Sequence, residues 1–79
     1  MGRALFIHAE WDTEAGVWVA MSDDVPGLVA EADTFEALSA KLDRLLPELL
    51  QANGYCGDPH VVFELLARRY AVAHLAGAP

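Results

Sequence analysis

Apolar and polar side chains alternate along the first part of the chain, residues 4–11. Leu5, Ile7, Ala9 and Trp11 point to one side of an extended chain, and Phe6, His8 and Glu10 point to the other. Alternation with a period of two, in a stretch that contains β-branched and aromatic residues, predicts a half-buried strand.

A second strand is predicted over residues 17–22. Residues 12–16 form the connecting loop, and Gly16 can supply a positive φ there. With a five-residue loop, the expected opposed pairs are Trp11 and Val17, Ala9 and Val19, and Ile7 and Met21. This register gives the hairpin one continuous apolar face, and a slip of one residue would break that face up.

The next stretch, residues 22–34, connects the hairpin to a helix. Pro26 fixes φ and Gly27 tolerates the left-handed region, so this pair predicts a turn. Residues 28–32 then form a short third strand. Asp33 and Thr34 are both good helix N-caps, and Glu36 follows Asp33 at the spacing of a capping box.

One amphipathic helix is predicted after this cap. Its apolar residues recur at steps of three and four and make a single stripe. The stripe consists of Phe35, Leu38, Leu42, Leu45, Leu46, Leu49 and Leu50. Asn53 and Gly54 provide a C-terminal stop.

The pattern of residues 60–75, near the end of the chain, fits neither period cleanly. As a strand, it places Phe63, Leu65 and Ala67 on one face; as a helix, its apolar stripe is broken by Arg69. The β-branched residues at its start favour a strand over residues 61–70.

The predicted order is therefore β-β-β-α-β, an α+β domain with a small antiparallel sheet and one helix packed on one face. We expect residues 1–79 to form a single domain without a separate DNA-binding module. The second face of the sheet has no cover in this arrangement, and the hairpin register places Phe6, His8, Trp18 and Ala20 on it. Exposed large aromatic residues with apolar neighbours predict a protein interface. The alternative is that the C-terminal segment covers this face.

Composition adds a reason for association. A chain of 79 residues has a marginal core of its own, yet 54% of its residues are hydrophobic, which exceeds the roughly 45–50% of typical soluble domains. The single cysteine, Cys56, excludes an internal disulfide and fits a reducing cytosol. We expect a homo-oligomer or a complex with a partner protein.

Net charge narrows the choice of partner. The chain carries twelve acidic and five basic side chains, for a net charge of −7. Direct nucleic-acid binding requires a basic face, so this charge predicts attraction to a basic protein instead. The alternative is that the acids only keep an apolar protein soluble. No apolar run has the length of a membrane span and no signal peptide is recognisable, so we expect a cytoplasmic protein.

The residues offer little catalytic chemistry. Asp23 and Asp24 could contribute to the metal site of a metal-dependent nuclease, but stabilisation of the turn explains the pair better. The three histidines and Cys56 lack the spacing of a zinc site, and no nucleophile–base pair is recognisable. We therefore expect no catalytic residues, no metal and no cofactor, and a protein that is not an enzyme.

The crossover carries a resemblance to a known family. SDDVPGLVAEADTFEAL, preceded by GVWVAMS, resembles the HicB-like antitoxin domain, and it looks closer still to a small bacterial family of uncharacterised function that shares this fold. The resemblance covers residues 4 to about 53 well. Its matching residues are Val17, Val19, Ala20, Ser22, Asp24, Val25, Pro26, Gly27, Asp33, Thr34 and Ala37.

This resemblance implies a function in a type II toxin–antitoxin system. HicB proteins neutralise HicA, a small basic ribonuclease, by covering its active-site face. A typical HicB protein adds a C-terminal DNA-binding module, and we expect none in these 79 residues. The alternative function is a stand-alone oligomeric regulator or scaffold protein without a toxin partner.

Overall fold

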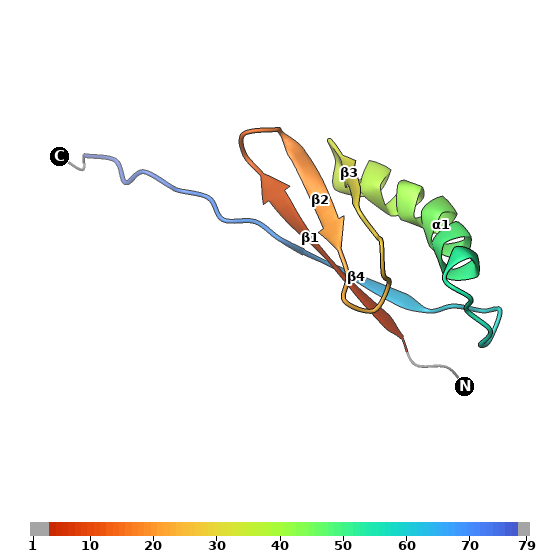
Figure 1. Ribbon diagram of the computed structural model, residues 1–79. Coiled ribbons are helices and arrows are strands. Elements are labelled where there is room, and N and C mark those ends of the chain that lie inside the picture. The colour runs from red at the N-terminus through yellow and green to blue at the C-terminus, as the bar shows by residue number, and fades with distance from the viewer. Residues whose placement is uncertain (1–3, 78–79) are drawn as a thin grey trace.

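The computed structural model describes residues 4–77 and contains four strands and one helix within them (Figure 1). The elements are β1 (Leu5–Asp12), β2 (Val17–Met21), β3 (Ala30–Ala32), α1 (Phe35–Ala52) and β4 (Phe63–Arg68). The β-β-β-α-β order confirms the predicted α+β class, and β4 lies within the stretch for which the sequence favoured a strand.

The strands form one sheet in the order β3-β2-β1-β4. β1 pairs antiparallel with β2, and β2 pairs antiparallel with β3, as expected. β4 pairs parallel with β1, so the sheet is mixed where the sequence suggested an antiparallel one. The reason is the crossover through α1, which carries the chain from one edge of the sheet to the other and returns it in the direction of β3 and β1.

The hairpin register differs by one residue from the prediction. Trp11 lies opposite Trp18 and Ala9 lies opposite Ala20, because Asp12 belongs to β1 and pairs with Val17. The Asp12 carboxylate accepts hydrogen bonds from the backbone N–H groups of residues 14 and 15, at 3.1 and 3.2 Å. These bonds stabilise a four-residue loop in place of the predicted five. Since side chains alternate along a strand, this shift exchanges the two faces of β2.

The core lies between α1 and the helix-facing side of the sheet. Three alanines, Ala9, Ala20 and Ala30, are paired across β1, β2 and β3, and all three are buried. Their small side chains let α1 approach closely, so that its leucines fill the space above them. The buried leucines of the helix are Leu38, Leu42, Leu46 and Leu50.

Both ends of α1 have recognisable caps. The hydroxyl of Thr34 accepts a hydrogen bond from the backbone N–H of Ala37 at 3.0 Å, so Thr34 is the N-cap. Of the two predicted N-caps, Thr34 is therefore confirmed. Asp33 is exposed and precedes the cap, so the capping box predicted from Asp33 to Glu36 does not start the helix. At the other end, Gly54 has a φ of 78°, and the N–H of Tyr55 donates to the carbonyl of Leu50 in a Schellman motif.

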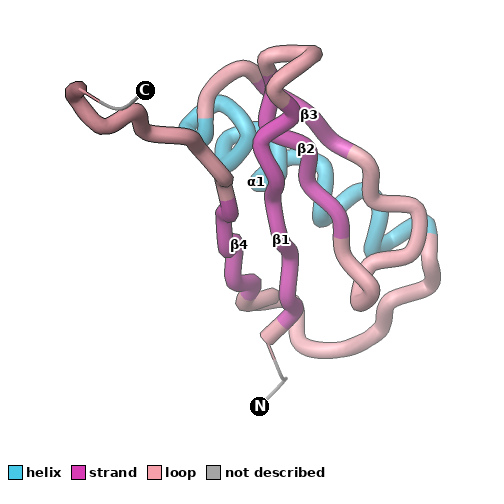
Figure 2. Tube along the Cα trace, turned by 90° about the vertical axis from the view of Figure 1, so that its left-hand side faces the viewer, coloured by secondary structure: helices cyan, strands magenta, loops and turns pink. Residues whose placement is uncertain are grey.

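The helix lies over the β2 and β3 side of the sheet and leaves the β4 side open (Figures 1 and 2). After β4, residues 69–77 extend away from the sheet and cover neither of its faces (Figure 1). The chain is accordingly 59 Å long, and its radius of gyration is 15.9 Å, against about 12 Å for a compact chain of this length. No helix in residues 4–77 is long and apolar enough to cross a membrane.

Candidate protein-binding surface

Two polar residues of the SDDVPGL stretch, Ser22 and Asp24, hydrogen-bond to the backbone of β1. Where β2 turns away from β1, side chains take over the pairing with Phe6: its N–H donates to the Asp24 carboxylate at 2.8 Å, and its carbonyl accepts from the Ser22 hydroxyl at 2.6 Å. The Ser22 oxygen also accepts from the N–H of Asp24 at 3.0 Å. Ser22 and Asp24 thus satisfy backbone groups that would otherwise face an open end of the hairpin.

Pro26 and Gly27 occupy the two central positions of a turn. The N–H of Leu28 donates to the carbonyl of Val25, and Gly27 has a φ of 84°, which is the pattern of a type II turn. Val25 and Leu28, on either side, are both buried in the core. The Asn53 side chain at the end of α1 donates to the Pro26 carbonyl at 2.9 Å. The motif residues therefore hold the fold together and do not converge on a site.

The side of the sheet opposite α1, here called the outer sheet face, is uncovered. The registers of the four strands assign its residues. They are Phe6, His8 and Glu10 of β1, Val17, Val19 and Met21 of β2, Glu31 of β3, and Glu64, Leu66 and Arg68 of β4.

An apolar patch lies in the middle of this face. His8 lies between Met21 on β2 and Leu66 on β4, and Phe6 is on the same strand two residues earlier. Phe6 is 59% exposed, Leu66 63% and Met21 40%. Three large apolar side chains exposed around one histidine exceed the scattered apolar residues of an ordinary surface.

Acidic residues surround the patch. Glu64 lies beside Phe6, and Glu31 lies beside Val19, and both carboxylates are exposed. Arg68 donates to the Glu10 carboxylate at 2.7 Å, and this hydrogen bond raises the pKa of the guanidinium. Because the positive charge of Arg68 is paired, the remaining carboxylates give the face an acidic character.

Two of the four residues predicted for this face belong to the other side. Trp18 packs edge-on between Trp11 and Phe35, with ring centroids 5.4 and 6.0 Å apart, and Ala20 is completely buried under α1. The one-residue error in the hairpin register caused both misplacements. Phe6 and His8, on β1, lie on the outer sheet face as predicted.

Sequence reasoning missed Met21 and Leu66. The hairpin register assigned Met21 to the core face. Leu66 had a usable signal, since the alternation of residues 63–68 already set it apart from Phe63 and Leu65, but which strand would lie beside it was unknown. Leu66 reaches the patch only because β4 pairs with β1 and places Leu66 beside His8.

Potential metal-binding and nucleophilic side chains are dispersed. Within residues 4–77, no three His, Cys, Asp or Glu side chains come together as a metal site would require. Asp24 is engaged with the backbone of Phe6, whereas its neighbour Asp23 is exposed. Cys56 is an exposed free thiol. His60 lies 3.6 Å from the Asp58 carboxylate on an exposed loop.

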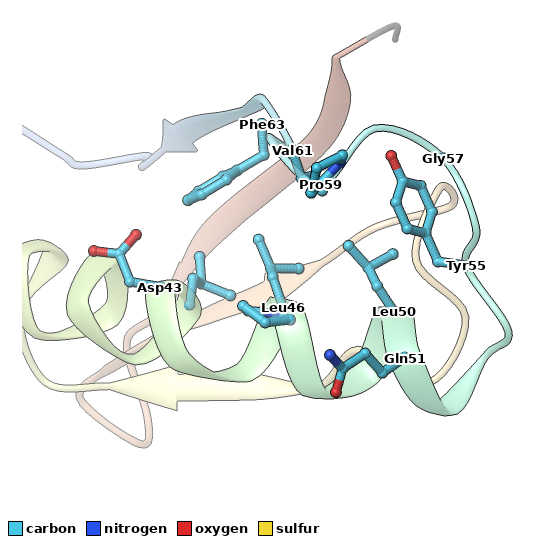
Figure 3. Close-up of a pocket in the computed structure, with 11 residues that line it drawn as sticks. Asp43, Leu46, Leu50, Gln51, Tyr55, Gly57, Pro59, Val61 and Phe63 are labelled. Atoms are coloured by element: carbon cyan, nitrogen blue, oxygen red, sulfur yellow. The ribbon is translucent and has the colours of Figure 1, made fainter.

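A groove on the opposite side of the molecule, here called the α1–β4 groove, separates the helix from β4 and the loop before it (Figure 3). Its volume is about 490 Å³. The leucines of α1 form one wall, Phe63, Val61 and Pro59 face them, and Tyr55 and Gly57 lie at one end (Figure 3). The groove exists because α1 covers β2 and β3 and leaves the helix-facing side of β4 open.

Comparisons with known proteins agree with this fold. Residues 4–75 match the family described as "Domain of unknown function (DUF1902)". The chain is also similar to the crystal structure of a hypothetical protein, TTHA1013, from the extremely thermophilic bacterium Thermus thermophilus, with 54% sequence identity and a TM-score of 0.79. That alignment covers 90% of this chain and 100% of the other. A search among curated proteins found no match. Because the family match spans nearly the whole described chain, this protein belongs to the DUF1902 family.

Proposed function

We propose that this protein is a non-catalytic binding module whose outer sheet face docks a small basic protein. The observation that carries the proposal is the apolar patch of Phe6, Met21 and Leu66, surrounded by carboxylates. An apolar centre with a charged rim is the usual composition of a protein interface. The acidic rim attracts a basic partner during encounter, and the apolar centre supplies affinity when water is expelled.

The resemblance of the crossover sequence to HicB antitoxins suggests the kind of partner. A HicA-like ribonuclease toxin is small and basic, so its charge complements the net charge of −7 of this chain. In this function the protein neutralises the toxin by covering its active-site face. This function requires no catalytic chemistry from the antitoxin.

The test is co-expression with the product of an adjacent gene that encodes a small basic protein. We expect the two proteins to co-purify and the growth arrest caused by the basic protein to be relieved. Binding should weaken steeply between low and high salt, because the encounter depends on exposed charges. Absence of both co-purification and rescue would exclude the antitoxin function.

Two matched variants connect this result to the outer sheet face. Phe6→Ser with Met21→Ser removes apolar surface that is already exposed, so the fold should persist while binding falls at least tenfold. Phe6→Leu with Met21→Leu keeps the surface apolar and should bind as the native protein does. Equal binding by both double variants would show that the partner docks elsewhere.

A stand-alone oligomeric regulator or scaffold is the second candidate function. It is favoured by the exposed apolar side chains of the C-terminal segment, residues 69–77. These side chains lie outside the outer sheet face and could be buried by self-association. The two functions differ in the salt-dependent binding of a basic partner, which only the antitoxin requires.

A further inference from the structure

The C-terminal segment, residues 69–77, extends away from its own domain and leaves its large apolar side chains exposed. Tyr70, Val72 and Leu75 are each more than 80% exposed. Burial of such side chains is favourable, so leaving three of them in water forgoes a large stabilisation for so small a protein. The family match extends through residue 75, so most of this segment belongs to the domain that defines the family.

β4 leaves an open edge from which this segment emerges. The N–H of Leu5 donates to the carbonyl of Val62, so in the parallel ladder Glu64, Leu66 and Arg68 bond to β1. The N–H and C=O groups of Phe63, Leu65 and Ala67 consequently point to the free side of the sheet. The opposite edge, β3, has three residues, and the ammonium of Lys41 donates to its Glu31 carbonyl. β4 is therefore the edge available for pairing.

The α1–β4 groove has the apolar lining that could bury this segment, but the segment of the same chain leaves in the wrong direction. The groove lies at the start of β4, beside Pro59, Val61 and Phe63. The segment begins at the far end of the strand, where Arg69 lies 5.2 Å from the centre of the Trp11 ring, and continues away from the domain (Figure 1). It would have to reverse its course to reach the groove of its own chain.

We propose that the occupant of each groove is the C-terminal segment of a second copy, in a dimer whose two β4 strands pair antiparallel across a two-fold axis. The two-fold axis is perpendicular to the sheet and passes near Leu65. The two sheets then form one continuous sheet, and both helices lie on the same side of it. The axis places the end of each β4 beside the start of the other. With Leu65 opposite Leu65 of the second copy, Arg69 lies beside Val61 of that copy, and Leu75 reaches the level of its Tyr55–Gly57 loop.

The distribution of charge agrees with this exchange. All twelve acidic side chains lie within residues 10–64, whereas the C-terminal segment, residues 69–77, contains Arg69 and no acid. A basic segment that enters an acidic domain gains attraction that a segment of the same charge would not. Asp43 lines the groove, so the second copy offers a negative charge there.

Disulfide crosslinking tests the exchange in the full chain. Cys56 is the protein's own exposed thiol and lies between two lining residues of the groove. In the Leu75→Cys variant, mild oxidation should link the introduced thiol to Cys56 of the second copy and give a covalent dimer on a non-reducing denaturing gel. A link within one chain, or no link, overturns the proposal.

Two controls make the crosslink specific. Leu75→Cys combined with Cys56→Ser should give no covalent dimer; a link that persists would place the segments elsewhere and overturn the assignment. Glu31→Cys puts a thiol on the outer sheet face of β3, at the edge of the sheet farthest from β4, and should also give no link to Cys56.

Sedimentation equilibrium measures the dimer itself. Ala67→Pro removes an N–H that points to the open edge and leaves the bonds to β1 intact, so we expect the mass to fall to that of a monomer at micromolar concentration. Ala67→Ser should remain dimeric. Tyr70→Ser with Val72→Ser and Leu75→Ser should weaken dimerisation at least tenfold. Full dimerisation of both the proline and the triple variant would refute the pairing.

The proposed dimer and the proposed function can be refuted independently of each other. Phe6→Ser with Met21→Ser should weaken binding of a basic partner at least tenfold without changing the mass in sedimentation. A native dimer that binds no basic protein would leave the exchange standing and remove the antitoxin function. A monomer that binds one would do the reverse.

Discussion

The Asp24 carboxylate accepts a hydrogen bond from the backbone N–H of Phe6, at 2.8 Å and 18 residues away in the sequence. The bond continues the β1–β2 ladder beyond the point where the backbone of β2 has turned off toward the core. A side chain thereby fixes where the hairpin ends and where the crossover begins.

Asp24→Ala should destabilise the protein by about 1.5–3 kcal/mol, because the N–H of Phe6 loses a charged acceptor. Urea denaturation monitored by tryptophan fluorescence measures the change. Asp23→Ala removes the neighbouring, exposed carboxylate and should change the free energy of unfolding by less than about 0.5 kcal/mol. Equal losses in the two variants would contradict the structural assignment of Asp24.

Thr34→Ala should cost about 1 kcal/mol, since the hydroxyl of Thr34 caps the N-terminus of α1. Asp33→Ala should have no comparable effect, because Asp33 precedes the cap. Thermal unfolding followed by far-ultraviolet circular dichroism separates the two. A larger loss for Asp33→Ala would show that the helix begins one residue earlier.

Gly27→Ala should destabilise the turn by about 1–2 kcal/mol, because alanine at a φ of 84° meets the steric penalty of the left-handed region. Gly27→Asn should lose less, since asparagine tolerates that region. Space is not the cause: a Cβ at Gly27 would meet only the Leu49 side chain, at 4.0 Å. Urea midpoints that fall in the order Gly, Asn, Ala are the expected outcome.

Leu42→Ala should cost about 2–5 kcal/mol, because Leu42 is completely buried and its truncation leaves a cavity between α1 and the sheet. That is comparable to the whole stability of a single small core, so we expect a chain that is largely unfolded at physiological temperature. Val29→Ala, at a site that is 77% exposed, should be nearly neutral. A folded Leu42→Ala variant with an unchanged midpoint would mean that the core lies elsewhere.

The sequence by itself determined the first four elements and their order, and it favoured a strand for the fifth. Alternation defined β1 and β2, the Pro26–Gly27 turn and the short third strand followed from backbone chemistry, and the leucine stripe defined α1. These signals are local, because they depend on side-chain periodicity, φ preferences and capping within a few residues. Because one helix covers only one face of a sheet, the sequence also predicted an uncovered outer sheet face. The alternation along β1 placed Phe6 and His8 on that face, where the structure has them.

Only the tertiary structure decided which side chains share a face and which strands are neighbours. The hairpin register depends on Asp12, whose carboxylate stabilises a four-residue loop, and one residue of slip moves Trp18 and Ala20 under the helix. The parallel pairing of β4 with β1 joins segments more than fifty residues apart, and it brings Leu66 beside His8 and opens the groove next to α1. Such contacts arise from packing between distant segments, on which local patterns carry no information.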